Sequence, residues 1–143
     1  MNNFSDIQQL LKSDLEQADQ ILTARLSSNV ALINQMSNYI IGAGGKRLRP
    51  LLLLLCARAT GYQGEHHHLM AVVIELIHTA TLLHDDIVDE STTRRGKDTT
   101  NEVWGNAPSV LVGDFLYSRA FEMMVEPDSM RIMQILSKAT NSI

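Results

Sequence analysis

The stretch EHHHLMAVVIELIHTATLLHDDIVDE, residues 65–90, contains neither glycine nor proline, and its apolar residues recur with helical spacing. We therefore expect one long helix over these residues. Its last turns carry four acidic side chains: Asp85, Asp86, Asp89 and Glu90. Negative charge is unfavourable at the C-terminal end of a helix, because the helix dipole is negative there. This helix end therefore requires a compensating cation.

The remaining sequence also has the spacing of helices and almost no strand signal. We expect further helices over residues 4–26, 29–41, about 50–60, 108–125 and from 129 onward. Residues 51–55 are all apolar, which predicts that their helix is buried on every side. The segment STTRRGKDTTNEVWGNA, residues 91–107, is predicted to be a long loop, a kind of segment that is usually functional or disordered. The sequence predicts an all-α fold.

The composition limits the classes of function. At 143 residues the chain is long enough for one domain, and its net charge of −4 argues against a nucleic-acid partner. Cys56 is the single cysteine, so no internal disulfide can form and a reducing compartment is expected. The N-terminus does not resemble a signal peptide, and the longest apolar run is too short to span a bilayer. We expect one cytoplasmic domain over residues 1–143.

The acidic end of the long helix is a candidate metal site. His78, Asp85 and Asp89 lie within about 20° of one line along the predicted helix, with Asp86 beside them. Mg²⁺ takes one or two carboxylates and completes its shell with water and substrate phosphates. We favour a metal or phosphate site here, and a solvated helix end is the alternative.

Two basic clusters accompany the acidic patch. GGKRLRP, residues 44–50, places Lys46, Arg47 and Arg49 between a glycine turn and a helix start, which suits a diphosphate. A basic surface turn is the alternative. Arg94 and Arg95 follow the acidic patch, and planar guanidinium groups bind phosphates through two hydrogen bonds. Together the clusters predict a site for two phosphate esters bridged by Mg²⁺.

Histidines offer a competing interpretation. Glu75-x-x-His78 and Glu65-x-x-His68 match the spacing of carboxylate-bridged di-iron sites, but those motifs must lie on facing helices. Here both lie on one helix, about 15 Å apart, which argues against that chemistry. We interpret the run of residues 66–68 as exposed and structural, with a transition-metal site as the alternative.

These motifs resemble those of the trans-isoprenyl diphosphate synthase (polyprenyl synthetase) family. GGKRLRP, His78, DDIVD and the Arg94–Arg95 pair occur in that family's order and spacing, between about Ile33 and Met124. The segments ELIHTATLLHDDIVDES and SVLVGDFLYSRAF look most like the long-chain, octaprenyl-type bacterial synthases. The resemblance implies an antiparallel helical bundle of the isoprenoid synthase type, of which about six helices are present.

The resemblance also implies a role for each motif. Asp85 and Asp89 would hold Mg²⁺ on the allylic diphosphate with support from Asp86, and Arg94 would contact the same diphosphate. Four side chains would bind isopentenyl diphosphate: Lys46, Arg49, His78 and Arg95. The implied reaction is head-to-tail condensation of these substrates into a long all-trans product, which partitions to the membrane.

Product length has its own positions in this family, where bulky residues four and five places before the first aspartate close the product tunnel. Those positions are Thr81 and Ala80 here, and both side chains are small. The resemblance therefore implies a long-chain product.

The chain also departs from the family pattern. The family's second aspartate-rich motif and the lysine–threonine pair that precedes it are absent from this sequence, and Asp98 stands where many members have proline. We expect an N-terminal portion that is inactive alone and associates with another copy as a homodimer. A non-catalytic partner subunit of a prenyl synthase is the alternative. A terpene cyclase is a weaker alternative, because GGKRLRP would bind a second diphosphate and cyclases bind only one.

Overall fold

The chain folds around one long central helix, α5. In the computed structural model, residues 3–43 and 45–143 are described; residues 1, 2 and 44, the last being the first glycine of GGKRLRP, lie outside that set. The elements in chain order are α1 (Phe4–Leu10), α2 (Lys12–Arg25), α3 (Ala31–Gly42), α4 (Leu48–Ala59), α5 (His67–Val88), β1 (Thr93–Arg94), β2 (Lys97–Asp98), α6 (Thr100–Trp104), α7 (Asn106–Met124) and α8 (Met130–Asn141). The all-α prediction is confirmed.

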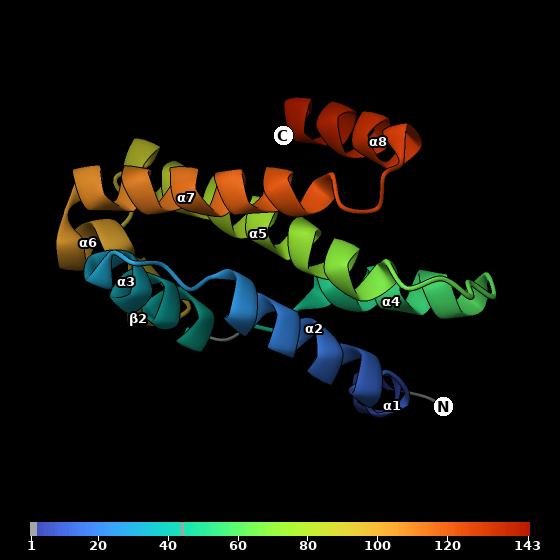
Figure 1. Ribbon diagram of the computed structural model, residues 1–143. Helices are drawn as coiled ribbons and strands as arrows, with labels where there is room; N and C mark the ends of the chain where they lie inside the picture. The colour runs from blue at the N-terminus through green and yellow to red at the C-terminus, as the bar shows by residue number, and fades with distance from the viewer. Residues whose placement is uncertain (1–2, 44) are drawn as a thin grey trace.

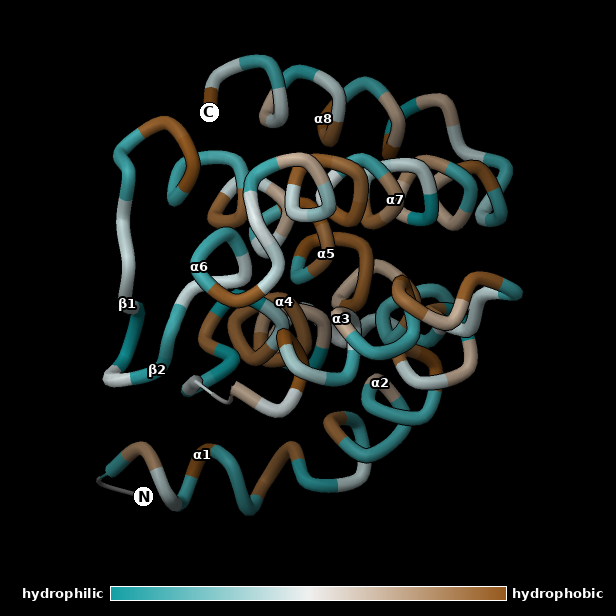
Figure 2. Tube along the Cα trace, turned by 90° about the vertical axis from the view of Figure 1, so that its left-hand side faces the viewer, coloured by the Kyte–Doolittle hydropathy of each residue, from teal (hydrophilic) through white to brown (hydrophobic). Residues whose placement is uncertain are grey.

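Helix α5 forms the centre of the core. It packs mainly against α7, which returns along it in the opposite direction, and also against α4 and α2 (Figure 1). Val73, Leu76, Ala80 and Leu83 recur at helical spacing on its buried side. Figure 2 shows hydrophobic residues concentrated in α5 and α4, whereas α2 is mostly hydrophilic. None of the helices in the described ranges is long and apolar enough to cross a bilayer.

The first predicted helix is divided in two. Leu11 lies between α1 and α2 with φ −99° and ψ 13°, and its side chain is fully buried. It packs in a small second cluster with Leu51, Leu54 and Ala71. Helical spacing continues through residue 11, so the sequence pattern gave no sign of this break.

Helix α4 differs from its prediction in burial. Leu51 and Leu54 are buried, but Leu52 is 49% exposed. The prediction that this helix is buried on every side is therefore wrong. The reason is its position: α4 packs against α5 and α2, which leaves one side open (Figure 1).

The predicted loop over residues 91–107 is ordered into β1, β2 and the short helix α6. Thr99 Oγ1 and Asn101 Nδ2 both donate to the Ser91 carbonyl at 2.9 Å. The Trp104 ring meets Tyr39 edge-on, with centroids 5.0 Å apart, and so anchors the segment to α3. The extra helix α6 and the division at residue 11 account for the difference from about six helices.

Candidate functional site

A cleft opens beside the middle of α5. Its empty volume, including its opening to solvent, is about 930 Å³. The apolar lining comes from α2, α3, α5 and α7: Leu22, Leu26, Ile40, Ile41, Leu76, Leu82, Leu83 and Leu116. The charged and basic lining residues include Arg47, Glu75, His78, Asp86, Arg94, Arg95 and Lys97. The lining also includes Asp98, so four cationic side chains and three carboxylates form the charged rim of an apolar pocket.

His78 links the two basic clusters that the sequence predicted. Arg49 Nη1, at the start of α4, lies 3.1 Å from His78 Nε2, and because arginine only donates, the ring nitrogen accepts. Burial lowers the pKa of His78, and the charges of Arg49, Arg95 and Arg94 lower it further. The imidazole is therefore neutral at pH 7, and its tautomer is fixed by Arg49.

The cleft lining also contains Glu75 and Arg47, to which the family resemblance gave no individual role. Glu75 lies one turn before His78, and burial raises its pKa although Arg47, Arg49 and Arg95 oppose that shift. Arg47 lies at the cleft and is also 3.6 Å from Asp19 on α2. Arg47 is part of GGKRLRP, so its position in the motif was the available signal.

Two tight turns position the cationic side chains. Arg95 and Gly96 connect β1 to β2 with φ 52° and 74°, as in a two-residue hairpin whose central residues both have positive φ. Arg47, before α4, also has a positive φ of 49°. Non-glycine residues rarely adopt this conformation, and such strain concentrates at functional sites.

Gly45 brings the two basic clusters into contact. Its φ of +117° disfavours any other residue, and an added Cβ would overlap the guanidinium of Arg95. Lys46 follows on the same turn and is exposed. The structure therefore places the Lys46 turn directly against the arginine hairpin.

Gly45→Ala is expected to destabilise the chain by about 1–2 kcal/mol and to displace Arg95 from the turn. Urea denaturation followed by circular dichroism measures this change. Gly42→Ala is the matched control, because an added Cβ at Gly42, the last residue of α3, meets nothing within 4 Å. Equal stability of the two variants would show that the Gly45 conformation is not required.

The compensating cation at the end of α5 is Arg94. Its Nη2 donates to Asp86 Oδ1 at 2.6 Å and its Nε donates to Oδ2 at 3.1 Å. Asp86 is buried, whereas Asp85 and Asp89 are exposed. The hydrogen bonds to Asp86 raise the pKa of Arg94, and the charges of Asp85 and Asp89 add to this effect. Asp86 thus holds an arginine and is not free to serve as a ligand.

The two exposed carboxylates fit the prediction for Mg²⁺. Asp85 and Asp89 lie one turn apart at the open end of α5, outside the residues that line the cleft. Tyr117 of α7 is near: burial raises its pKa, and the charge of Asp85 raises it further. Two carboxylates facing solvent are a suitable donor set for a cation that keeps water and substrate phosphates in its shell.

Ala80 and Thr81, the predicted product-length positions, do not line the described cleft. Ala80 is fully buried in the core. Thr81 is half-buried, and its hydroxyl donates to the His78 carbonyl at 2.6 Å. It lies one turn before Asp85, so any tunnel that it borders runs on the acidic face of α5.

Comparison with known proteins agrees with these motifs. The polyprenyl synthetase family profile matches residues 30–143. Octaprenyl diphosphate synthase of Escherichia coli (strain K12) is 50% identical over 141 residues, which is 99% of this chain and 44% of that protein. The all-trans-nonaprenyl-diphosphate synthase of Rhodobacter capsulatus is 45% identical over 139 residues, covering 96% and 43%.

Two solved structures match this chain with a similar sequence identity and coverage. A polyprenyl synthase from Caulobacter crescentus CB15, in complex with calcium and isoprenyl diphosphate, matches with a TM-score of 0.93 and 46% identity. The alignment covers 97% of this chain and 42% of that one. A decaprenyl diphosphate synthase from Rhodobacter capsulatus matches with a TM-score of 0.91 and 45% identity over 96% and 42%. The chain thus spans less than half the length of these relatives, and by sequence and fold it belongs to the polyprenyl synthetase family.

Proposed function

We propose that this chain contributes the first part of the active site of a long-chain trans-polyprenyl diphosphate synthase. This enzyme joins isopentenyl diphosphate head-to-tail to an allylic diphosphate. The observation that carries the proposal is the cluster of arginines around neutral His78, next to the exposed pair Asp85 and Asp89. The octaprenyl and nonaprenyl synthases among its relatives support a long product.

Asp85 and Asp89 would hold Mg²⁺, and the calcium and isoprenyl diphosphate bound to the related Caulobacter crescentus structure support a divalent cation and this ligand class. When bound, Mg²⁺ supplies positive charge that offsets the charge developing on the leaving diphosphate. Arg94, already held in place by Asp86, would present its remaining donors to the same diphosphate. Asp86 therefore acts by positioning Arg94.

Four basic side chains would bind isopentenyl diphosphate: Lys46, Arg49, His78 and Arg95. The allylic C–O bond breaks, and its electron pair leaves with the diphosphate. The double bond of isopentenyl diphosphate then supplies the electrons for the new C–C bond, and loss of a proton forms the new double bond. The chain's contribution is electrostatic, because fixed cations need no reorganisation as charge develops.

Product length tests the tunnel proposal. Thr81→Phe in the complete protein is expected to shorten the product, because a bulky ring one turn below Asp85 would block chain growth. Mass spectrometry of the extracted products measures the chain length. Ala80→Phe is a poorer probe than the sequence suggested, because Ala80 is fully buried and overpacking costs about 1–3 kcal/mol. An unchanged product from a folded Thr81→Phe protein would exclude this position from the tunnel.

The test of the function uses the complete protein that carries this sequence, with Mg²⁺, labelled isopentenyl diphosphate and an allylic diphosphate. We expect transfer of label into a long all-trans product by the complete protein, and no transfer by the 143-residue chain alone. Sedimentation velocity of the same samples tests the homodimer that the exposed Leu111 and Phe121 of α7 lead us to propose. A complete protein without transfer that alters another synthase's product would instead be a partner subunit.

A further inference from the structure

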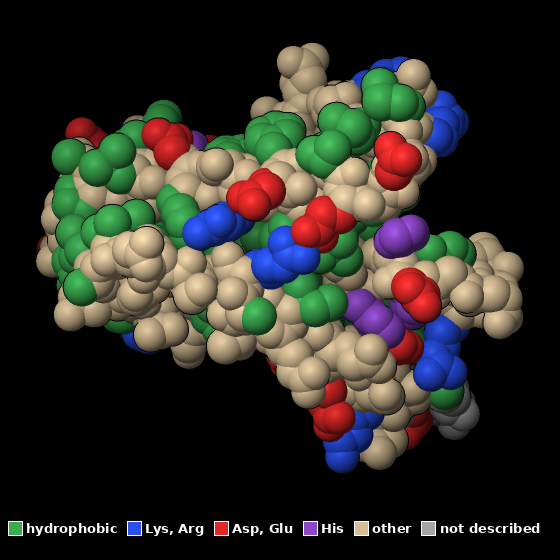
Figure 3. Space-filling view, viewed as in Figure 1, with side chains coloured by type: hydrophobic (Ala, Val, Ile, Leu, Met, Phe, Trp, Pro, Cys, Tyr) green, Lys and Arg blue, Asp and Glu red, His purple; other side chains and the backbone are tan. Residues whose placement is uncertain are grey.

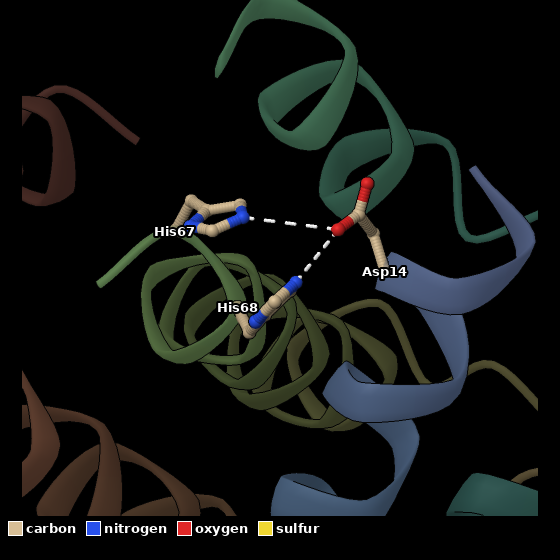
Figure 4. A group of neighbouring side chains, drawn as sticks. All are labelled: Asp14, His67 and His68. Atoms are coloured by element: carbon tan, nitrogen blue, oxygen red, sulfur yellow. Dashed lines mark hydrogen bonds and ion pairs between the residues drawn. The ribbon is translucent and has the colours of Figure 1, made fainter. Parts of the chain in front are cut away.

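A second group of polar side chains lies at the opposite end of α5 from the acidic motif. Asp14 projects from α2, and His67 and His68 are the first two residues of α5 (Figure 4). His68 and Asp85 are separated by about 26 Å along the helix axis. This group is therefore independent of the proposed synthase site.

The three side chains converge on one point. His68 Nε2 lies 2.8 Å and His67 Nε2 lies 3.7 Å from the same carboxylate oxygen, Asp14 Oδ1 (Figure 4). The three potential ligand atoms all lie within 4.8 Å of one another. Among the residues that the structure describes, no other histidine, cysteine or acidic side chains form such a group.

The surroundings hold each of these side chains in place. Arg58 Nε donates to the second oxygen of Asp14 at 3.0 Å, which orients Oδ1 towards the histidines. The Tyr62 ring packs edge-on against His67 at 5.3 Å, and it fills the space that a side chain at Gly64 would need. The loop before α5 is therefore shaped around His67.

His67 and His68 are more buried than His66, the histidine that precedes them. Asp14 is 7% exposed, and the side chains of His67 and His68 are 19% and 14% exposed, whereas His66 is exposed. The interpretation of all three histidines as exposed is thus wrong for two of them. Figure 3 shows histidine side chains reaching the surface near the start of α5, so solvent has access to the group.

His67 has unused bonding capacity. Its Nε2 is farther from Asp14 than a hydrogen bond allows, and its Nδ1 is buried without a partner among the described residues.

We propose that Asp14, His67 and His68 bind a divalent transition-metal ion of the zinc type. Two imidazole nitrogens and one carboxylate oxygen, with water in an open position, are a ligand set that suits Zn²⁺ and its neighbours rather than Mg²⁺. Tetrahedral bonds of about 2.0–2.2 Å place ligand atoms roughly 3.3–3.6 Å apart. His67 Nε2 and Asp14 Oδ1 are already near that separation at 3.7 Å, whereas His68 Nε2 and Asp14 Oδ1, now 2.8 Å apart, would move apart. The bound ion would tie α2 to the start of α5.

The test titrates Zn²⁺ into the 143-residue chain, made without a polyhistidine tag, by isothermal calorimetry at pH 7. We expect one site per chain, and a melting temperature that rises by about 5–10 °C at a hundredfold excess over Kd. Asp14→Asn and His68→Ala should each weaken binding at least tenfold. His66→Ala and Asp85→Asn are the matched controls and should retain it. The proposed metal site and the proposed Mg²⁺ site lie about 26 Å apart along α5. A failure to bind Zn²⁺ would therefore leave the proposed function untouched.

Co²⁺ gives a second measurement that reports on the ligands directly. Four-coordinate geometry gives Co²⁺ strong visible absorption, which Asp14→Asn should remove by taking away one ligand, while circular dichroism shows the chain folded. Equal loss of affinity in His66→Ala, or unchanged affinity in His68→Ala, would overturn the proposal, since either result indicates weak binding to the histidine run as a whole. No detectable binding of either ion would overturn it as well.

Discussion

Asp85→Asn in the complete protein is expected to lower the proposed prenyl-transfer turnover at least about 100-fold, the scale on which loss of one transition-state charge contact acts. Asparagine keeps the shape of the side chain but removes half of the charge offered by Asp85 and Asp89. Because both carboxylates are exposed, the substitution should leave the free energy of unfolding nearly unchanged. The loss is therefore expected in catalysis and not in folding.

The measurement is the steady-state rate as a function of Mg²⁺ concentration, with unfolding curves for both proteins. Glu90→Gln is the matched control, because Glu90 is the next exposed acid along the chain and lies outside the proposed ligand pair. It should retain the parental rate. Parental turnover in Asp85→Asn would identify the acidic end of α5 as a solvated helix end.

Arg94→Met is expected to destabilise the chain by about 3 kcal/mol. The Asp86 side chain is 5% exposed and its pair with Arg94 has two hydrogen bonds, so removing the arginine leaves a buried charge without compensation. We place the effect at the lower end of the range for buried pairs because Arg94 itself is 41% exposed. Urea denaturation of the 143-residue chain measures it.

A double-mutant cycle separates the interaction energy of the Asp86–Arg94 pair from the cost of changing each side chain alone. Asp86→Asn combined with Arg94→Met removes both charges, so the double variant should be more stable than Arg94→Met alone. Arg131→Met on α8 is the control, because Arg131 is exposed and has no hydrogen bond or ion pair within the described ranges. It should change the unfolding free energy by less than about 0.5 kcal/mol. Additive effects of Asp86 and Arg94 would contradict the pairing.

The parts of the fold that the sequence predicts well are those in which one physical rule acts alone. Helix α5 has an unbroken apolar repeat, so its extent was predicted to within two residues at each end. The need for a cation at its acidic end followed from the helix dipole, and Arg94 meets that need. Neither inference depends on distant parts of the chain.

The parts that it misses depend on residues far apart or on very short elements. Strands β1 and β2 have two residues each, too few to produce an alternating pattern. Asp14 and His68 are 54 positions apart, and no local spacing relates them. Leu11 interrupts a helical pattern because it packs against residues of α4 and α5, contacts that a local pattern does not contain.

The left-handed conformation of Arg47 and Arg95 costs stability at two positions that carry cations of the cleft. Glycine adopts this conformation without the cost of about 1 kcal/mol or more that a side chain adds. A variant library screened only for heat resistance would therefore favour glycine at both positions, and each such variant would remove a cation from the cleft. Glycine should therefore be excluded at these two positions from any library that is built to raise thermal stability.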